Sequence, residues 1–179
     1  PADALEDSEE LAVWAREAMN VALAARTSDR PDAAPRPAGA GERGIERERI
    51  DAFDSLRRDW EPRFRQFAAD QPGADPGHGL VHLERVVASA LRLAAEEGAR
   101  VEVVLPAAWL HDCVHVTKDS PDRAHASRLA AVHAAGFLRD AGYPESLLAD
   151  VQHAIEAHSY SAGIPPRTIE AKVVQDADR

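Results

Sequence analysis

In the middle of the chain, an apolar helical stripe runs directly into a histidine, an aspartate and a second histidine. Apolar residues recur at helical spacing across Val101–Ala108, and the same face then reaches His111, Asp112 and His115. A buried carboxylate without a partner is costly, so Asp112 would need a cation. A bound metal would satisfy both His111 and Asp112. The simpler interpretation is a hydrogen-bonded His-Asp pair at the end of a buried helix.

Two other stretches favour the metal interpretation. Upstream, Leu83–Ala94 carries an apolar face at helical spacing, and His82 lies on the edge of that face. Downstream, an apolar run ends in Asp176 and Asp178, and helical periodicity allows either of them to turn inward. The sequence therefore predicts that a histidine and an aspartate from separate helices accompany the His-Asp pair.

These residues resemble the signature of the HD-domain superfamily of metal-dependent phosphohydrolases. In that signature one helix carries a His, a second helix carries a His-Asp pair, and a later segment carries an Asp. The resemblance implies that His82, His111, Asp112 and Asp178 are the metal ligands, because Asp178 stands in the matching Ala-Asp-Arg segment. The strings LHDCVHVTKDSPDRAHASRLAA and AIEAHSYSAGIPPRTIEAKVVQDADR are similar to a bacterial branch of small stand-alone HD hydrolases, and they extend the likeness over Asp75–Arg179.

The implied ligand set contains two imidazoles and two carboxylates, which suits Mn²⁺, Co²⁺, Ni²⁺, Fe²⁺, Zn²⁺ or Mg²⁺. Such an ion activates water and neutralises phosphate oxygens, so phosphate hydrolysis is the expected chemistry. His158 is the best candidate for a second-metal or supporting ligand, and His125 and His153 are weaker candidates. We expect one tightly held metal.

The polar loop HVTKDSPDR follows the His-Asp pair and resembles the second polar cluster of the family. Lys118 and Arg123 could hold the outer phosphate oxygens, Arg as a fork and Lys as a point charge. Asp119 could orient water or relay a proton, and His115 could act as acid to the leaving group. A solvated turn is the simpler interpretation of the same residues.

Composition agrees with a protein that has one sizeable core. The chain has 179 residues, 45% of them hydrophobic, and a net charge of −10, which argues against a general nucleic-acid-binding surface. The single Cys113 excludes an internal disulfide, and we interpret it as a small buried residue rather than a nucleophile. No run approaches the roughly 18 apolar residues of a membrane span, and no signal peptide is recognisable, so we expect a cytoplasmic protein.

The expected fold is all-α, an HD-domain helical bundle with an N-terminal helical extension. Residues 1–26 contain an amphipathic helix over Ser8–Ala25, residues 27–44 form a linker rich in Pro, Ala and Gly, and residues 45–179 form the HD domain. Because related proteins continue with further helices, we expect the C-terminal part of the domain to be missing after Arg179.

Prolines mark several of the expected helix boundaries. Pro62 should kink the aromatic-rich helix of Ile45–Ala69 or start a new one. Pro106 should interrupt the backbone hydrogen bonds of the helix that leads to His111, unless that helix starts at Pro106. The aromatic stripe of the first helix is expected to pack in the core rather than bind a ligand.

Three more helices are expected in the C-terminal half. One should run from Ser120 to Gly142 with its inward face formed by Ala126, Leu129, Ala130, His133 and Phe137. The next should begin at Pro144 and turn Leu147, Leu148, Val151, Ile155 and His158 to one face. The last should start near Thr168.

The leading functional hypothesis is a metal-dependent phosphohydrolase that cleaves a phosphomonoester or phosphoanhydride bond of a small nucleotide-like molecule. Its partner would be a small phosphorylated metabolite or nucleotide, and a homodimer is compatible with the sequence. One alternative is an HD-type di-iron oxygenase, which would require the extra histidines as ligands. The other is a non-catalytic, metal-stabilised interaction module, and metal stoichiometry would separate these hypotheses.

Overall fold

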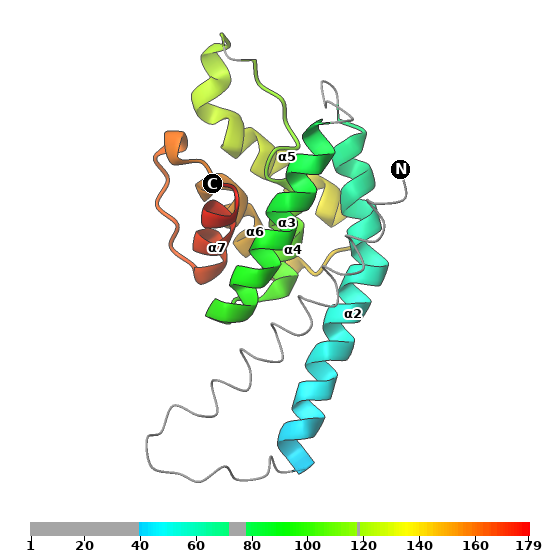
Figure 1. Cartoon of the computed structure of the whole chain (residues 1–179). Coiled ribbons are helices and arrows are strands. Elements are labelled where there is room, and N and C mark those ends of the chain that lie inside the picture. Colours follow the sequence, from blue (N-terminus) through cyan, green and yellow to red (C-terminus); the bar gives the residue numbers. More distant parts are fainter. Residues whose placement is uncertain (1–39, 72–77, 118) are drawn as a thin grey trace, which may run out of the picture.

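The computed structural model describes residues 40–71, 78–117 and 119–179, and it describes side chains from residue 51 onward apart from those at 78 and 121. All regular secondary structure in these ranges is helical, so the predicted all-α class is confirmed (Figure 1). Within these ranges no helix combines the length and the apolar character needed to cross a membrane. The predicted amphipathic helix of Ser8–Ala25 lies outside the described residues.

Helices follow one another along the described chain in a single bundle. They are α2 (Ala40–Ala69), α3 (His78–Glu97), α4 (Val101–Leu110), η1 (Pro121–His125), α5 (Ala126–Asp140), α6 (Glu145–Ala157), η2 (Tyr160–Ala162) and α7 (Ile169–Ala177), of which η1 and η2 are 3₁₀. The central helix is α4, which packs against α2, α3, α5, α6 and α7. Every residue of Val103–Leu110 is buried, as expected for a helix that is apolar on all sides.

The central helix continues through Pro106, which interrupts its backbone hydrogen bonds as predicted but does not begin it. It starts at Val101, so Pro106 stands in its interior. Proline has no N–H to donate to the carbonyl of Glu102 four residues earlier. The hydroxyl of Tyr143 donates to that carbonyl instead, at 2.6 Å. The lost backbone hydrogen bond is therefore replaced by a side chain that is distant in sequence.

The long helix α2 also contains a proline without ending there. It is one helix from Ala40 to Ala69 with Pro62 inside, so the predicted new helix start is wrong. Pro62 and Arg58, whose carbonyl loses its backbone donor, are both exposed, and water can satisfy that carbonyl. Helix α2 includes Gly44, the predicted end of the linker.

The aromatic face of α2 packs in the core, as predicted. Phe53, Leu56 and Phe64 are buried. The ring of Trp60 meets that of Tyr143 edge-on, with centroids 4.7 Å apart. The contact anchors α2 to the segment between α5 and α6, where the same tyrosine supports α4.

The predicted inward face of α5 is only partly correct. Leu129 is 43% exposed and His133 is also exposed, although both were expected to face inward. The buried positions are Ser127, Ala130, Ala131, Ala134, Ala135 and Leu138. Alanine occurs all around this helix, so its apolar periodicity is too weak to define one face. The helix is preceded by η1, where the Ser120 hydroxyl accepts a hydrogen bond from the Asp122 amide at 3.2 Å.

The last two α-helices agree with the sequence pattern. Val151, Ile155 and His158 are buried on the inner side of α6. The side chain of Thr168 caps α7 by accepting a hydrogen bond from the Ala171 amide at 3.1 Å. The two helices pack against each other and against α4, which brings their C-terminal ends to the same region.

Candidate metal centre

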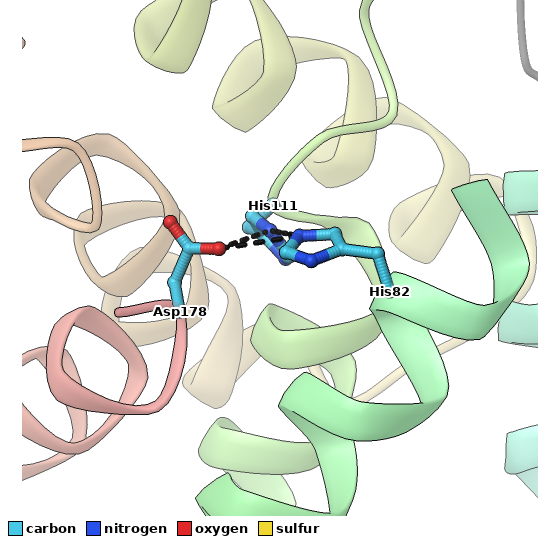
Figure 2. Close-up of side chains that lie close together, drawn as sticks. All are labelled: His82, His111 and Asp178. Carbon is cyan, nitrogen blue, oxygen red and sulfur yellow. Dashed lines mark hydrogen bonds and ion pairs between the residues drawn. The ribbon is translucent and has the colours of Figure 1, made fainter. Parts of the chain in front are cut away.

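Three of the predicted ligands converge on one point. His82 lies in the first half of α3, His111 follows the last residue of α4, and Asp178 follows the last residue of α7. Figure 2 shows their polar atoms facing one another. His82 Nε2 lies 3.2 Å from Asp178 Oδ1 and 3.4 Å from His111 Nε2, and His111 Nε2 lies 3.4 Å from Asp178 Oδ1.

These separations fit ligands that share one ion. Ligand atoms about 2.1 Å from a common metal lie about 3.0–3.5 Å apart in octahedral or tetrahedral geometry. The three distances fall in that range. Asp112 Oδ2 lies 3.6 Å from His111 Nε2 and 4.0 Å from His82 Nε2, so a small movement of its exposed side chain would complete a fourth ligand.

The ring of His111 is oriented from behind by the backbone. It is fully buried, and its Nδ1 lies 2.8 Å from the carbonyl of Ala108, which places Nε2 toward the cluster. Burial alone would lower the pKa of His111, but the hydrogen bond to Asp178 and the charges of Asp112 and Asp178 raise that pKa above the ordinary value. The two carboxylates therefore favour a positive charge at this point.

The structure brings Asp178 to the cluster and leaves Asp176 outside it. The hydrogen bond from His111, supported by the neighbouring imidazoles, lowers the pKa of Asp178 to about 2, so its carboxylate is negative at neutral pH. Asp176 is exposed and lies 3.7 Å from Arg179, without a contact to a site histidine. Of the two aspartates that could turn inward, Asp178 is therefore the one that faces the site.

The C-terminal ends of three helices meet at the cluster. His111, His158 and Asp178 directly follow the last residues of α4, α6 and α7. The last carbonyls of a helix carry partial negative charge, which favours a cation nearby. The fold therefore adds to the negative potential that Asp112 and Asp178 create.

Asp112 is not buried, which corrects the sequence-based prediction. Its side chain is 61% exposed. The predicted stripe assumed that α4 continues, but α4 ends at Leu110 and the chain turns, with the Cys113 amide donating to the Leu110 carbonyl at 3.2 Å. His115, also predicted on that stripe, is exposed. Asp112 therefore reaches the cluster from its solvent side.

Cys113 is the small buried residue that the sequence predicts. Its thiol donates to the carbonyl of Ala130 at 3.4 Å. Burial raises the pKa of this thiol to about 12, so it is not a thiolate at neutral pH. Burial and this raised pKa agree with a packing role for Cys113.

His158 joins the cluster on its inner side. It forms a second group of close polar atoms with His111 and Asp112, and its Nε2 lies 3.8 Å from Asp112 Oδ1. Its Nδ1 lies 2.6 Å from the carbonyl of Ile155. Burial and then the charge of His111 lower the pKa of His158, so a neutral ring with Nε2 as acceptor is favoured.

The two weaker histidine candidates lie elsewhere. His153 is buried, and its Nε2 accepts a hydrogen bond from the Arg167 amide at 3.0 Å, so it serves the packing of the segment before α7. His125 is exposed at the end of η1. Neither belongs to a potential metal group among the described residues.

The four predicted catalytic residues are not gathered at the cluster. Lys118 lies outside the described residues. His115 and Asp119 are exposed in the segment between α4 and η1. Arg123 is exposed and donates to the backbone carbonyl of Val116 at 3.0 Å. No contact recorded among the described residues joins these side chains to the ligands, so their roles stay predictions.

One basic residue beside the cluster was not predicted. Arg85 lies one helical turn after His82, and its Nη2 is 3.2 Å from His82 Nδ1. The spacing of three residues between His82 and Arg85 is a sequence signal that could have found it, because such residues share a helix face.

A second polar network fixes the start of α7. Arg100 Nε donates to Glu170 Oε1 at 2.9 Å, and Arg100 Nη2 donates to Asp150 Oδ2 at 2.6 Å. Burial of Glu170 would raise its pKa, but the hydrogen bond from Arg100 holds that pKa below its ordinary value. The start of α7 is therefore tied to α6 and to the residue that precedes α4.

The other end of α7 is tied to α6 by a buried glutamine. Gln175 Nε2 donates to the carbonyl of Ala157 at 2.7 Å. Ala157 precedes His158, and Gln175 lies one turn before Asp178. This hydrogen bond therefore fixes the distance between the helix ends that carry His158 and Asp178.

The family comparison covers this whole arrangement. A family model described as the HD domain matches residues 79–179, which is more than half of the chain and includes every residue of the cluster. No curated protein and no solved structure matches the chain. HD domains form a superfamily of metal-dependent hydrolases, and they bind divalent metals. The chain belongs to the HD domain family.

Proposed function

We propose that this protein is a metal-dependent phosphohydrolase that uses metal-activated water to cleave a phosphomonoester or phosphoanhydride bond of a small nucleotide-like substrate. The observation that carries the proposal is the convergence of His82, His111 and Asp178, whose ligand atoms are 3.2–3.4 Å apart. Membership of the HD domain family supports the same chemistry.

We assign His82, His111, Asp112 and Asp178 as the residues that hold the ion. A divalent ion bound there would supply Lewis acidity, lowering the pKa of a water molecule and neutralising phosphate charge. His111 closes the inner side of the cluster because it is fully buried. The side chains of Asp112 and His82 are 61% and 31% exposed, so the cluster is open to solvent on their side. Substrate would enter from that side.

The protein residues have distinct tasks in this proposal. The Ala108 carbonyl holds the His111 ring through its Nδ1, so that this ring does not have to be reoriented when substrate binds. Asp112 is the most exposed proposed ligand, and its carboxylate could accept a proton from an incoming water. The loop with His115, Lys118, Asp119 and Arg123 remains our candidate for contacts to the phosphate and the leaving group.

We also propose a three-part organisation of the chain. Residues 1–26 would carry the amphipathic helix, and the linker would end before α2 rather than at Gly44. The segment from Ala40 to Arg179 would form the HD unit, because α2 packs directly against the central helix α4. The family match begins later, at residue 79, so α2 would be an addition to the matched domain.

A metabolite screen tests the proposed reaction. The full chain, loaded with Mn²⁺, Co²⁺ or Ni²⁺, is offered phosphomonoesters and nucleoside di- and triphosphates, and release of phosphate or pyrophosphate is measured. We expect turnover with at least one compound, complete loss in His111→Ala and retention in Asp176→Asn, since Asp176 is exposed outside the cluster. No turnover on any compound by the metal-loaded protein would contradict the proposal.

The position of His158 favours one alternative enough to test it. His158, His111 and Asp112 form a second potential metal group that shares His111 with the first. Because His111 Nδ1 lies against the Ala108 carbonyl, its Nε2 could serve only one ion, and a second ion, as the di-iron oxygenase hypothesis requires, would depend on His158 and Asp112. Two irons per chain together with substrate-dependent oxygen consumption would replace the hydrolase proposal, whereas one ion per chain would exclude the di-iron alternative.

A further inference from the structure

The guanidinium of Arg85 lies against the outer nitrogen of a proposed metal ligand. Its Nη2 is 3.2 Å from His82 Nδ1, while Nε2 of the same ring faces the cluster. Arg85 is exposed and forms no ion pair with a carboxylate among the described residues. Arg65 and Arg92, which flank it in sequence, are paired with Glu84 and Glu96. The charge of Arg85 is therefore available beside the cluster.

Hydrogen-bond chemistry determines which nitrogen of His82 carries the proton in this arrangement. A guanidinium only donates hydrogen bonds, so His82 Nδ1 accepts and Nε2 carries the hydrogen. That Nε2–H points to Asp178 Oδ1 at 3.2 Å. His111 has the opposite arrangement, because its Nδ1 lies against a backbone carbonyl and must donate. His158 is like His111, with its Nδ1 against the Ile155 carbonyl.

A metal ion at His82 Nε2 is incompatible with the contact to Arg85. The ion needs the lone pair of Nε2, so the ring hydrogen must move to Nδ1. Nδ1 and the guanidinium are then both donors, and they no longer attract each other. Metal binding would therefore release Arg85 on the open side of the cluster. A released guanidinium presents a fork of charged donors that suits two phosphate oxygens.

We propose that Arg85 is a further residue that binds the substrate's phosphate oxygens, held on His82 in the metal-free protein and released when the metal binds. The inference rests on the proposed function and specifies a substrate with an accessible phosphate group. The chain's net charge of −10 makes a local cation necessary for an anionic substrate. Arg123, one of the predicted candidates for this task, is instead hydrogen-bonded to the Val116 carbonyl.

Binding of inorganic phosphate to the full chain tests this role without reference to turnover. Phosphate is titrated calorimetrically into Mn²⁺-loaded and metal-free wild type, Arg85→Gln and Arg92→Gln. Arg92 is the matched control because it is an exposed arginine two turns further along α3. We expect phosphate to bind the loaded wild type and the loaded control equally, and about tenfold or more weakly to loaded Arg85→Gln, as expected for loss of a charge-assisted hydrogen bond. The metal-free proteins should show no such difference.

The Mn²⁺ affinity of the same variants distinguishes phosphate binding by Arg85 from support of the metal ligands by Arg85. Arg85→Gln should bind Mn²⁺ at least as tightly as wild type, because it lacks both the contact that competes with the metal and a nearby positive charge. Weaker Mn²⁺ binding would show that Arg85 supports the ligands, which overturns the inference. Equal phosphate affinity in loaded wild type and Arg85→Gln would also overturn it and leave the proposed function intact. Absence of phosphate binding by the loaded wild type would count against the proposed function itself.

Discussion

The two ends of α7 carry two clusters of charged side chains that differ in how their charge is balanced. At the start of the helix, Glu170 and Asp150 both pair with Arg100, at 2.9 and 2.6 Å. At its end, Asp178 and Asp112 face imidazoles, and no Lys or Arg in the described residues forms an ion pair with either carboxylate. The carboxylates of the first cluster are paired with a permanently charged side chain, whereas those of the second face only imidazoles among the described residues.

This difference separates a structural network from a binding site. Both clusters include buried or half-buried ionisable groups, so burial and charge alone do not distinguish them. The Arg100 network is complete because each acid already has a partner. The cluster around His111 gains from an added cation, since two carboxylates and three helix ends lower the potential there. Carboxylates that have no Lys or Arg partner are therefore a better indication of a functional site than burial or charge alone.

Removal of the histidine shared by both metal groups should have the largest effect. We expect His111→Ala to abolish metal binding, because this ring belongs to both groups. The metal-free variant should also lose roughly 1–3 kcal/mol of unfolding free energy, since a cavity forms and the Ala108 carbonyl loses its donor. Metal analysis by mass spectrometry and urea unfolding with a chelator measure the two effects.

In contrast, Asp112→Ala should lose metal with little change in metal-free stability, because its side chain is 61% exposed. A full equivalent of metal in either variant would contradict the site.

Breaking the complete network should produce the opposite pattern. Arg100→Ala leaves Glu170 buried without its partner, and we expect a loss of about 3 kcal/mol in unfolding free energy. The folded variant should still bind one equivalent of metal, because no metal ligand is changed. Glu170→Gln is a milder control, since it keeps a hydrogen-bond acceptor for Arg100. Loss of metal from folded Arg100→Ala would show that the two clusters are not independent.

The two aspartates near the C-terminal end of α7 allow the metal affinities of two neighbouring variants to be compared. Asp178→Asn keeps the shape of the side chain and removes its charge, so metal affinity should fall about 100-fold. Asp176→Asn should bind metal as tightly as wild type, because Asp176 is exposed and faces Arg179. Paired metal titrations measure both affinities. The reverse result would mean that the closing ligand stands two residues earlier than we assign it.

Metal affinity should also depend on pH, with a smaller effect per pH unit than the substitutions have and with a defined sign. The pKa of His111 lies above the ordinary imidazole value, and below that pKa a proton occupies the nitrogen that binds metal. Mn²⁺ affinity should therefore fall about tenfold per pH unit below the His111 pKa, starting above pH ~6.5. The stability of the metal-free protein should change with pH in the opposite direction. A His111 pKa that is higher in the folded state than in the unfolded state stabilises the fold below the unfolded-state pKa, and this stabilisation is lost as pH rises through the folded-state pKa. Calorimetry between pH 6 and 8 would contradict this account if Mn²⁺ affinity did not change.

Local signals were sufficient to predict much of the fold. The α6 face around Val151 and Ile155 follows from its apolar spacing, and the start of α7 follows from Thr168 as a cap. The interior position of Pro106 could not be predicted in the same way. Its missing hydrogen bond is replaced by Tyr143, which is distant in sequence and becomes a neighbour only after folding. Prolines were therefore the least reliable boundary signals.

The sequence predicted which residues form the candidate site but not how exposed each side chain is. His82, His111 and Asp178 meet as expected from the resemblance to the HD superfamily. The exposure of Asp112 depends on where α4 ends, and apolar spacing contains no stop signal at Leu110. The inward face of the alanine-rich helix α5 was mispredicted for a related reason. Alanine occurs on every side of this helix, so Leu129 appears as suitable for burial as its neighbours.

Anomalous diffraction from crystals of the Mn²⁺-loaded protein would locate the bound ion. We expect one strong anomalous peak within about 2.2 Å of His82 Nε2, His111 Nε2 and an Asp178 oxygen. Asp112 would complete the set from the solvent side. A peak bound by Asp150 and Glu170, or no peak in this cluster at saturating Mn²⁺, would contradict the assignment of the metal centre.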